Sequence, residues 1–297
     1  MKVSSMRKPR VLCVDDEPGV LRMLQWLLES QFDVTCTTDT REARARLRSD
    51  DFEVVISDQR MPGMLGTEFL RLARIESPNT MRLMLSSHSD FTEMLDAVNA
   101  SEVFRLMPKP WDDELLLDTV EYAAAVARSV PLPASAPTGE PDEDGALEVR
   151  DGEAVLLLDP DPATEQQIRG LLGTQVPIVW ARNIDEANAL VARHAVAVLL
   201  VETQVGATST VDWIRAVKRS QPHAVSIAMG AERDWAMVVR LINEAQIFRF
   251  LRKPLDLVQA HGMLHAALSQ HRMLMAHPLR TARYAVQRSL DDDLEFV

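Results

Sequence analysis

The chain has 297 residues, a formal net charge of −12 and 46% apolar residues, which is enough for two domains that each bury a core. Its basic residues are scattered, so DNA is not expected as a partner. The longest apolar run, Ala195 to Val201, is far shorter than the roughly 20 residues that cross a bilayer, and no secretory signal is recognisable. A soluble, cytoplasmic protein with no membrane partner is expected.

Short aliphatic and β-branched runs alternate with segments of helical periodicity in the first half of the chain. The expected strands are Val11–Val14, Phe32–Cys36, Val54–Ser57, Arg82–Leu85 and Val103–Met107. Alternating strands and helices predict an α/β, doubly wound domain with a parallel five-stranded sheet covered on both faces. In such folds ligands bind at the carboxyl ends of the strands, so the functional residues should directly follow the strands.

Three local patterns refine this prediction. An apolar stripe marks the first expected helix, and it comprises Leu21, Leu24, Trp26, Leu27 and Leu28. Asp39 and Glu42 have the spacing of a capping box at the start of the second helix. Cys13 and Cys36 lie inside strand-like runs without the spacing of a metal or redox pair, which favours buried, reduced thiols.

The second half of the chain repeats the first. At a constant offset of 144 residues, Asp15 aligns with Asp159, and Lys109-Pro110 aligns with Lys253-Pro254. Residues 131–152 between the halves have the Pro-, Gly- and acid-rich composition of a linker. A tandem duplication is therefore predicted. Its expected parts are a first domain at 1–128, a linker at 129–152, a second domain at 153–272 and a C-terminal helix and tail at 273–297.

Polar side chains stand at the end of four expected strands in the first half. They are Asp15 and Asp16, Asp58, Ser86, and Lys109 with Pro110. Carboxylates gathered at one sheet edge repel each other unless a hard cation neutralises them, and Mg²⁺ is the cation expected here. An aspartate held in line with a phosphate can act as a nucleophile and form an acyl phosphate. Asp58 is the expected nucleophile, and Ser86 and Lys109 would bind the phosphoryl oxygens.

The segments VLCVDDEPGV, VVISDQRMPG, LMLSSHSD and VFRLMPKPWDD resemble the signature segments of response-regulator receiver domains of bacterial two-component systems, over residues 10–128. The resemblance implies a flavodoxin-like (βα)5 fold with strand order 2-1-3-4-5. It implies that Asp58 is the phosphoacceptor and that Asp15 and Asp16 form the acid pocket. Mg²⁺ would be bound through Asp16, Asp58 and the backbone carbonyl of Arg60.

The resemblance also assigns roles around the phosphate. Ser86 would be the switch hydroxyl, and Lys109 the phosphate contact ahead of a cis peptide bond to Pro110. Receivers usually carry an aromatic switch residue where this chain has Leu106. Phe104 should point to the same face by strand alternation, and whether it substitutes is left open. Two further positions tune the lifetime of the acyl phosphate in this family, and they hold Arg60 and His88 here.

The matching site in the second half has changed. Glu202, Pro160 and Gly230 stand where the first half has Asp58, Asp16 and Ser86, while Asp159, Asp161 and Lys253 remain. Glu202 extends its carboxylate by one methylene, which spoils in-line geometry. The second domain is therefore predicted to be a degenerate pseudo-receiver. Two hypotheses stay open: that Glu202 pairs with Lys253 as a phosphate mimic, or that it is a relic.

Two further features distinguish the second half. Phe250 occupies the aromatic switch position of the second domain, so one hypothesis is that this domain has a protein-binding face. Asp159-Pro160-Asp161 resembles the start of haloacid-dehalogenase-type phosphatases, but Ala163 stands where that family has a hydroxyl. An aspartyl-nucleophile phosphatase is therefore the weakest alternative.

About 25 residues follow the second domain, too few for a DNA-binding output domain. The expected function is a response regulator that takes a phosphoryl group from a sensor histidine kinase and signals through protein contacts or homodimerisation. The downstream partner is not identified by the sequence. The alternative is a phosphate sink or scaffold for the kinase. No enzymatic activity is expected beyond self-phosphotransfer and autodephosphorylation at Asp58.

Overall fold

The computed structural model describes residues 7–87, 95, 99, 103–129, 153–173, 177–231 and 235–284. The chain divides into two compact units, Met1–Thr138 (unit 1) and Gly139–Val297 (unit 2). His88, nearly all of the predicted linker and the end of the C-terminal segment lie outside the described residues. None of the helices in the described part is long and apolar enough to cross a membrane.

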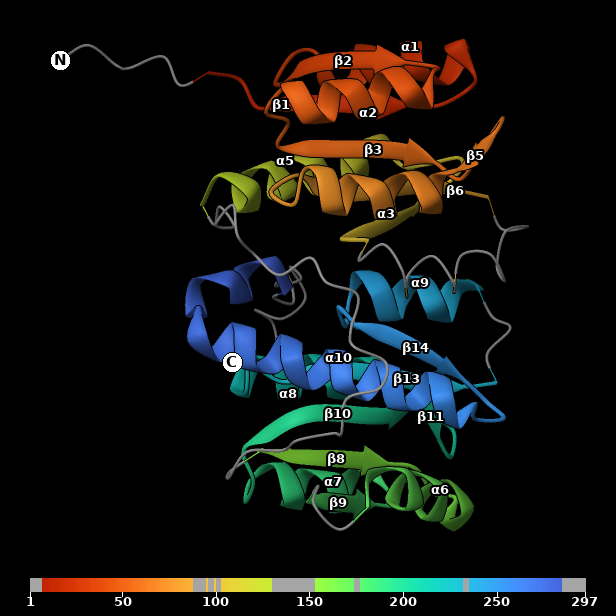
Figure 1. Cartoon of the computed structure of the whole chain (residues 1–297), viewed down its shortest axis with the longest axis vertical. Helices are drawn as coiled ribbons and strands as arrows, with labels where there is room; N and C mark the ends of the chain where they lie inside the picture. The colour runs from red at the N-terminus through yellow and green to blue at the C-terminus, as the bar shows by residue number, and fades with distance from the viewer. Residues whose placement is uncertain are drawn as a thin grey trace, which may run out of the picture. The chain divides into compact units, whose positions relative to one another are not determined.

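Unit 1 is built on a parallel five-stranded sheet (Figure 1). Its strands are β1 (Arg10–Val14), β2 (Asp33–Thr37), β3 (Val54–Asp58), β6 (Met81–Ser86) and β7 (Arg105–Pro108). Their order is β2-β1-β3-β6-β7, which confirms the predicted order 2-1-3-4-5. A small hairpin of β4 (Arg60–Met61) and β5 (Met64–Leu65) follows β3 and stands apart from this sheet.

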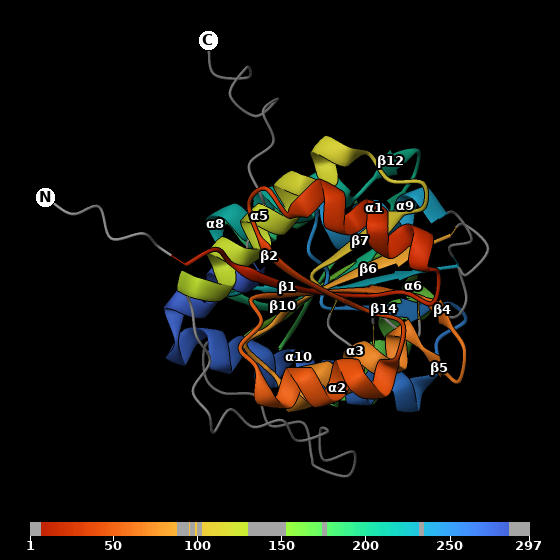
Figure 2. The ribbon, with the colours of Figure 1, turned by 90° about the horizontal axis from the view of Figure 1, so that it is seen from above.

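Helices cover both faces of the sheet in unit 1. Figure 2 shows α1 (Pro18–Leu28) and α5 (Asp113–Ser129) on one face, and α2 (Thr40–Ser49) and α3 (Gly66–Glu76) on the other. Leu21, Leu24 and Leu28 are buried in α1 as predicted. Trp26 is 74% exposed, so its place in the apolar stripe was wrong. It lies about 200° around the helix from Leu24, which turns it away from the sheet.

The predicted capping box at the start of α2 is only half formed. Asp39 is the N-cap, and its carboxylate accepts a hydrogen bond of 2.8 Å from the Arg41 N–H. Glu42 does not return to the Asp39 backbone; it accepts a hydrogen bond of 2.6 Å from the Thr37 hydroxyl instead. The Thr37 hydroxyl also accepts from the Asp39 N–H, at 3.1 Å, so it takes the place of the glutamate in the motif.

Unit 2 repeats the architecture. Its parallel strands are β8 (Ala154–Leu158), β9 (Ile178–Ala181), β10 (Val196–Glu202), β13 (Val225–Gly230) and β14 (Arg249–Arg252). Their order is β14-β13-β10-β8-β9, the order of unit 1 listed from the other edge. A hairpin of β11 (Gln204–Val205) and β12 (Thr208–Ser209) again follows the third strand. The predicted second flavodoxin-like sheet is therefore present.

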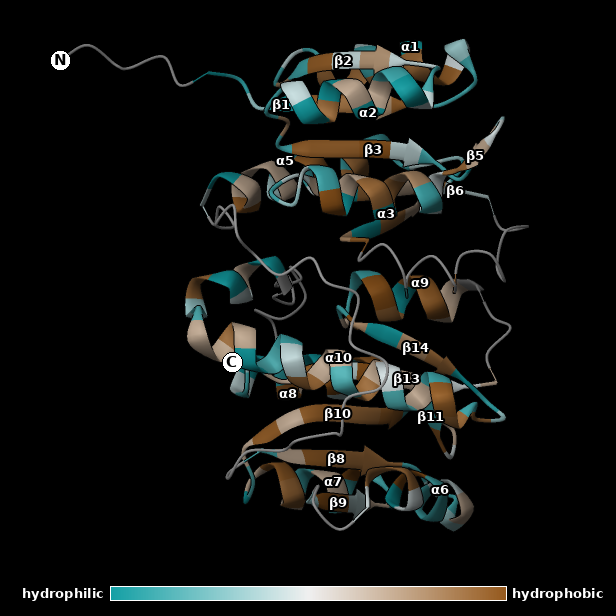
Figure 3. Ribbon diagram, viewed as in Figure 1, coloured by the Kyte–Doolittle hydropathy of each residue, from teal (hydrophilic) through white to brown (hydrophobic). Residues whose placement is uncertain are grey.

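The helices of unit 2 also follow the pattern of unit 1. They are α6 (Pro162–Leu172), α7 (Ile184–Val191), α8 (Val211–Ser220), α9 (Trp235–Asn243) and α10 (Leu257–Ala276), followed by the 3-10 helix η2 (Pro278–Tyr284). Central strands of both units consist mainly of apolar residues, seen as brown arrows for β3, β8 and β10 in Figure 3. Strands covered by helices on both faces require such composition.

Candidate functional site

The acidic edge of unit 1 is organised around one lysine. The Lys109 ammonium lies 2.7 Å from Asp15 Oδ2 and forms a second ion pair with Asp58 Oδ1. Asp15 follows β1, Asp58 ends β3 and Lys109 follows β7, so three strands bring these groups together. The expected cis peptide bond between Lys109 and Pro110 is present. The Lys109 N–H donates a 2.9 Å hydrogen bond to the Ser86 carbonyl, which ties the lysine to the end of β6.

Backbone N–H groups complete the hydrogen bonding of both carboxylates. Asp58 Oδ2 accepts a 2.6 Å bond from the Arg60 N–H, and Asp15 Oδ1 accepts a 2.9 Å bond from the Glu17 N–H. Burial raises the pKa of Asp15 because desolvation outweighs the stabilisation of its charge by Lys109 and Glu17. Burial alone would lower the pKa of Lys109, but hydrogen bonds to the two carboxylates outweigh it and the pKa is raised. Lys109 is therefore a cation held between two acids.

The donor chemistry at this edge suits a hard cation. The predicted Mg²⁺ ligands are the carboxylates of Asp16 and Asp58 and the carbonyl of Arg60, all oxygen atoms. Asp16 is partly exposed and Asp58 is 7% exposed. Within the described residues no group of three acidic, histidine or cysteine side chains forms a metal cluster. A set of two carboxylates and one carbonyl does not require such a cluster, because Mg²⁺ usually keeps several of its waters.

The predicted switch residues of unit 1 do not share one environment. Phe104 belongs to the core on the α1 and α5 side, where its ring stacks on Tyr122 of α5 at a centroid distance of 5.8 Å. Leu106 is buried but is not part of that core. The expectation that the two side chains point to the same face was wrong. Phe104 precedes β7 and lies in a bend, where strand alternation does not apply.

Unit 2 also has a lysine between two acids, but a glutamate replaces the aspartate that ends the third strand. Lys253 Nζ lies 2.6 Å from Asp159 Oδ2 and forms a second ion pair with Glu202 Oε2. The Asp161 N–H donates to Asp159 Oδ1 at 2.8 Å, as Glu17 does to Asp15. The predicted contact between Glu202 and Lys253 is present. Because Asp58 and Lys109 make the equivalent contact, this ion pair alone does not distinguish the two sites.

In unit 2 a threonine that was not predicted from the sequence, Thr203, packs against the carboxylate of Glu202. The backbone N–H and the hydroxyl of Thr203 both donate to Glu202 Oε1, at 3.0 and 3.1 Å. A Cβ atom built on Gly230 would come within 2.6 Å of Thr203 Oγ1 and 3.2 Å of Glu202 Oε1. Gly230 therefore lacks the hydroxyl that Ser86 has in unit 1. Because it has no side chain, it also leaves space that Thr203 occupies. Nothing in the local sequence marks Thr203, since it aligns with Gln59 rather than with a predicted site residue.

The second acid of the Asp159-Pro160-Asp161 sequence has a structural role. The Asp161 carboxylate accepts a 2.9 Å bond from the Ala163 N–H and thereby caps α6. Phe250, at the predicted switch position of this unit, is only 1% exposed. Its side chain does not contribute to the surface of unit 2 in this structure.

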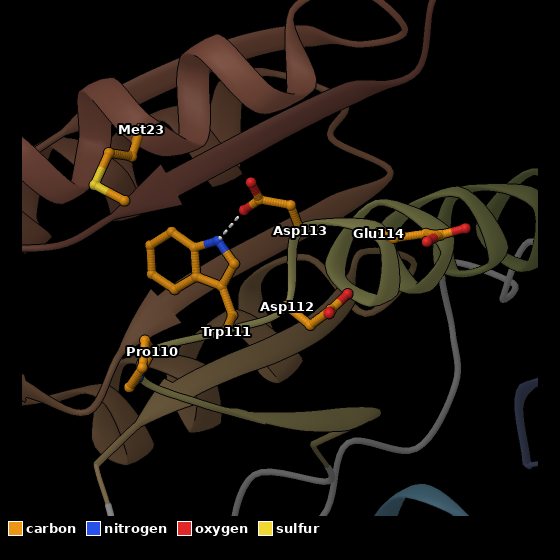
Figure 4. A pocket seen from close by; sticks show the side chains of 6 residues that line it. All are labelled: Met23, Pro110, Trp111, Asp112, Asp113 and Glu114. Atoms are coloured by element: carbon orange, nitrogen blue, oxygen red, sulfur yellow. Dashed lines mark hydrogen bonds between the residues drawn. The ribbon is translucent and has the colours of Figure 1, made fainter.

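A hollow lies beside the acidic edge of unit 1. It is lined by Met23 of α1 and by the segment from Pro110 to Glu114 that leads into α5 (Figure 4). The Trp111 indole N–H donates a 3.1 Å bond to Asp113, and Figure 4 shows the ring between Met23 and Asp113. Met23 is 58% exposed, and Trp26, three residues further along α1, is exposed as well. Large apolar side chains are thus available next to Lys109 and Pro110.

The comparisons with known proteins agree with this geometry. Residues 11–121 match the family model described as the response regulator receiver domain, and this part of the chain is a receiver domain. Hydrogenase transcriptional regulatory protein HoxA from Cupriavidus necator is 35% identical over 119 residues, which are 40% of this chain and 25% of that protein. DNA-binding transcriptional regulator NtrC from Salmonella typhimurium is 32% identical over 123 residues, again 40% and 25%.

These curated relatives are matched over about a quarter of their own length. Among solved structures, the signal receiver domain of an HD domain-containing protein from Pseudomonas fluorescens is 30% identical with a TM-score of 0.41. That alignment covers 43% of this chain and 96% of the solved one.

Proposed function

We propose that the chain is a two-component response regulator in which Asp58 accepts a phosphoryl group from a sensor histidine kinase and Glu202 does not. The observation that carries the proposal is the position of the Asp58 carboxylate. It ends β3 between the Lys109 ammonium and the Arg60 N–H, beside the buried carboxylate of Asp15. Groups that hold an aspartate and stabilise added negative charge are those that acyl-phosphate formation needs.

The transfer is a substitution at phosphorus. A carboxylate oxygen of Asp58 forms the new P–O bond, the P–N bond of the phosphorylated kinase histidine breaks, and the leaving imidazole nitrogen takes up a proton. Lys109 would then contact the phosphoryl oxygens, and the hydroxyl of Ser86, the last residue of β6, would do the same. Mg²⁺, held by Asp16, Asp58 and the Arg60 carbonyl, would supply charge neutralisation for the incoming phosphate.

The site of unit 2 is proposed to be a degenerate receiver site that is inert in transfer. Glu202 Oε2 is paired with Lys253, and Glu202 Oε1 accepts two hydrogen bonds from Thr203. Both oxygens of Asp58 have partners as well, so the difference lies in the Thr203 hydroxyl, a side-chain donor held against the Glu202 carboxylate. Pro160 stands where unit 1 has Asp16, which would hold the metal. The longer side chain also displaces the carboxylate, and a displacement of about 1 Å can reduce a rate roughly a hundredfold.

Signalling is proposed to proceed through protein contacts. Phosphorylation adds a dianion next to Lys109, which is held by two ion pairs before transfer. Redirecting Lys109 from Asp15 and Asp58 to the phosphoryl group biases the unit between two states. We place the kinase on the surface beside the site. This surface consists of the exposed side chains of Met23 and Trp26 and the hollow at Trp111. Homodimerisation is one form that the output could take.

The test is phosphorylation with acetyl phosphate and Mg²⁺, read by intact-mass spectrometry. Wild type and the matched control Glu202→Gln should each acquire a single phosphoryl group that is lost in alkali, whereas Asp58→Asn should acquire none. Glu202→Gln is the appropriate control because it alters the equivalent position in unit 2. Labelling of Asp58→Asn, or loss of labelling in Glu202→Gln alone, would contradict the assignment.

A further inference from the structure

The two cysteines of the chain face each other across neighbouring strands. Cys13 of β1 and Cys36 of β2 are register partners in a parallel pair of strands. Adjacent strands are about 4.8 Å apart, within the roughly 4.4–6.8 Å between Cα atoms that a disulfide spans. Both side chains belong to the core on the α1 side of the sheet, and the Cys36 thiol donates a 3.7 Å hydrogen bond to the Leu21 carbonyl of α1. The prediction of buried thiols is confirmed for Cys13, whereas Cys36 is only partly buried.

The two thiols have different environments, and the difference predicts which of them an oxidant reaches first. Cys13 is fully buried, whereas Cys36 is partly exposed on β2, the edge strand of the sheet. The neighbouring Cys13 thiol lowers the pKa of Cys36, whereas the Cys36 thiol and burial raise the pKa of Cys13. The thiolate is the species that reacts with oxidants, so Cys36 should react first and Cys13 should remain a thiol next to it.

We infer that Cys13 and Cys36 form a peroxide-oxidisable dithiol, a modification site that closes to a disulfide between β1 and β2. The oxidant is a hydroperoxide. The Cys36 thiolate attacks a peroxide oxygen, the O–O bond breaks, and Cys36 becomes a sulfenic acid while hydroxide leaves and is protonated to water. The Cys13 sulfur then attacks the Cys36 sulfur, the S–O bond breaks, and a second water leaves. Two thiols and one hydrogen peroxide thus give one disulfide and two waters.

Unit 2 provides an internal comparison. At the same register it pairs Leu157 of β8 with Trp180 of β9, so the repeat has the geometry without the sulfur. The chain contains two cysteines in all, so an intramolecular disulfide can only join Cys13 to Cys36. The assignment is independent of whether Asp58 accepts phosphate, because its readout is the state of the thiols.

The test treats the folded, full-length chain with hydrogen peroxide and quantifies free thiols and intact mass under non-reducing conditions. The expected result is loss of both thiols, a mass lower by two hydrogen atoms, a Cys13–Cys36 peptide in the digest and full recovery with dithiothreitol. Retention of both thiols would overturn the inference. So would oxidation that stops at sulfinic acid on Cys36, or disulfides found only between two chains.

Two single variants separate the steps, with circular dichroism confirming that each is folded. Cys13→Ala should accumulate a sulfenic acid on Cys36 that dimedone traps, because the second sulfur is missing. Cys36→Ala should show at least a tenfold slower loss of its remaining buried thiol. Equal reactivity of Cys13 and Cys36 in the two variants would contradict the proposed order. The wild-type measurement decides the inference even if one variant fails to fold.

Discussion

The acidic edges of units 1 and 2 share a framework and differ in what surrounds it. Each has a lysine between two acids, a cis proline after that lysine and a backbone N–H bound to the first acid. The lysine between two acids is therefore common to both sites and does not by itself separate a site proposed to accept phosphate from one proposed to be inert. What separates the sites is the packing around the acid that ends the third strand.

A second difference lies at the residue that directly follows the small hairpin. In unit 1 the Gly66 N–H bonds to the Gln59 carbonyl at 2.9 Å, and in unit 2 the Thr210 N–H bonds to the Thr203 carbonyl at 3.1 Å. Thr210 also places its hydroxyl 2.8 Å from the Glu202 carbonyl, whereas a Cβ on Gly66 would lie 1.9 Å from the Asp58 carbonyl oxygen. The chain after Asp58 approaches so closely that only glycine fits. The chain after Glu202 leaves room for a side chain.

The largest expected effect follows from this difference. Gly66→Ala should destabilise unit 1 by about 3 kcal/mol or more, since overpacking against backbone atoms that cannot yield costs at least as much as typical overpacking. The atoms nearest to the added methyl group belong to the backbone of Asp58 and Gln59. Urea denaturation measures the loss in free energy of unfolding, and hydrogen exchange of the β3 amides shows that the loss lies in unit 1.

The matched control for that substitution is Gly170→Ala on α6, where an added Cβ meets nothing within 4 Å. It should stabilise unit 2 by about 0.5–1 kcal/mol through helix propensity. If Gly66→Ala were as mild as the control, the close approach at Asp58 would not exist.

The second effect concerns the hydroxyl position. Gly230→Ser should destabilise unit 2 by about 1–3 kcal/mol, because its Cβ would lie 2.6 Å from Thr203 Oγ1. In a Thr203→Ala background the same substitution should cost clearly less, since the colliding hydroxyl is gone. The urea midpoints of the four proteins in this double-mutant cycle give the coupling energy. Additive changes would show that Thr203 does not occupy the space above Gly230.

Much of the fold could be predicted because its cues are local or periodic. Strand-forming runs, helical periodicity and the repeat offset led to both sheets, and the polar residues at strand ends led to Asp15, Asp58 and Lys109 meeting at one edge. The cis peptide at Pro110 followed from the family resemblance. These features depend on chain order and on the rule that strand ends share an edge.

The features that were missed depend on three-dimensional packing. Thr203 is revealed only by the space over Gly230, and the cysteine pair only by the register of two strands that are distant in sequence. Phe104 was misplaced because β7 begins one residue after it. Trp26 was misplaced although helical spacing alone sets it about 200° from Leu24, on the exposed side of α1. Strand boundaries and register are set by tertiary contacts, which a single sequence does not display.

The smallest expected effect contrasts the buried acid with its exposed neighbour. Burial raises the pKa of Asp15 above the ordinary 3.8, so the folded chain binds this proton more tightly than the unfolded chain does. The resulting stabilisation of the fold is fully present below the ordinary pKa of aspartate. It is lost as the pH rises through the raised pKa of Asp15 in the folded chain. At neutral pH the ionised Asp15 therefore opposes folding.

Asp15→Asn should remove this cost and stabilise unit 1 at pH 7 by on the order of 1 kcal/mol, the usual size of a single stabilising substitution. The gain should disappear below the ordinary aspartate pKa, where wild type is protonated as well. Urea midpoints measured in EDTA from pH 3 to pH 7 test this, with Asp16→Asn as the control that should stay within about 0.5 kcal/mol because its side chain is partly exposed. Only the cost of the Asp15 charge depends on pH, so a gain that is independent of pH would assign the effect to packing instead. The proposed site needs this charge, and the fold has to accommodate it.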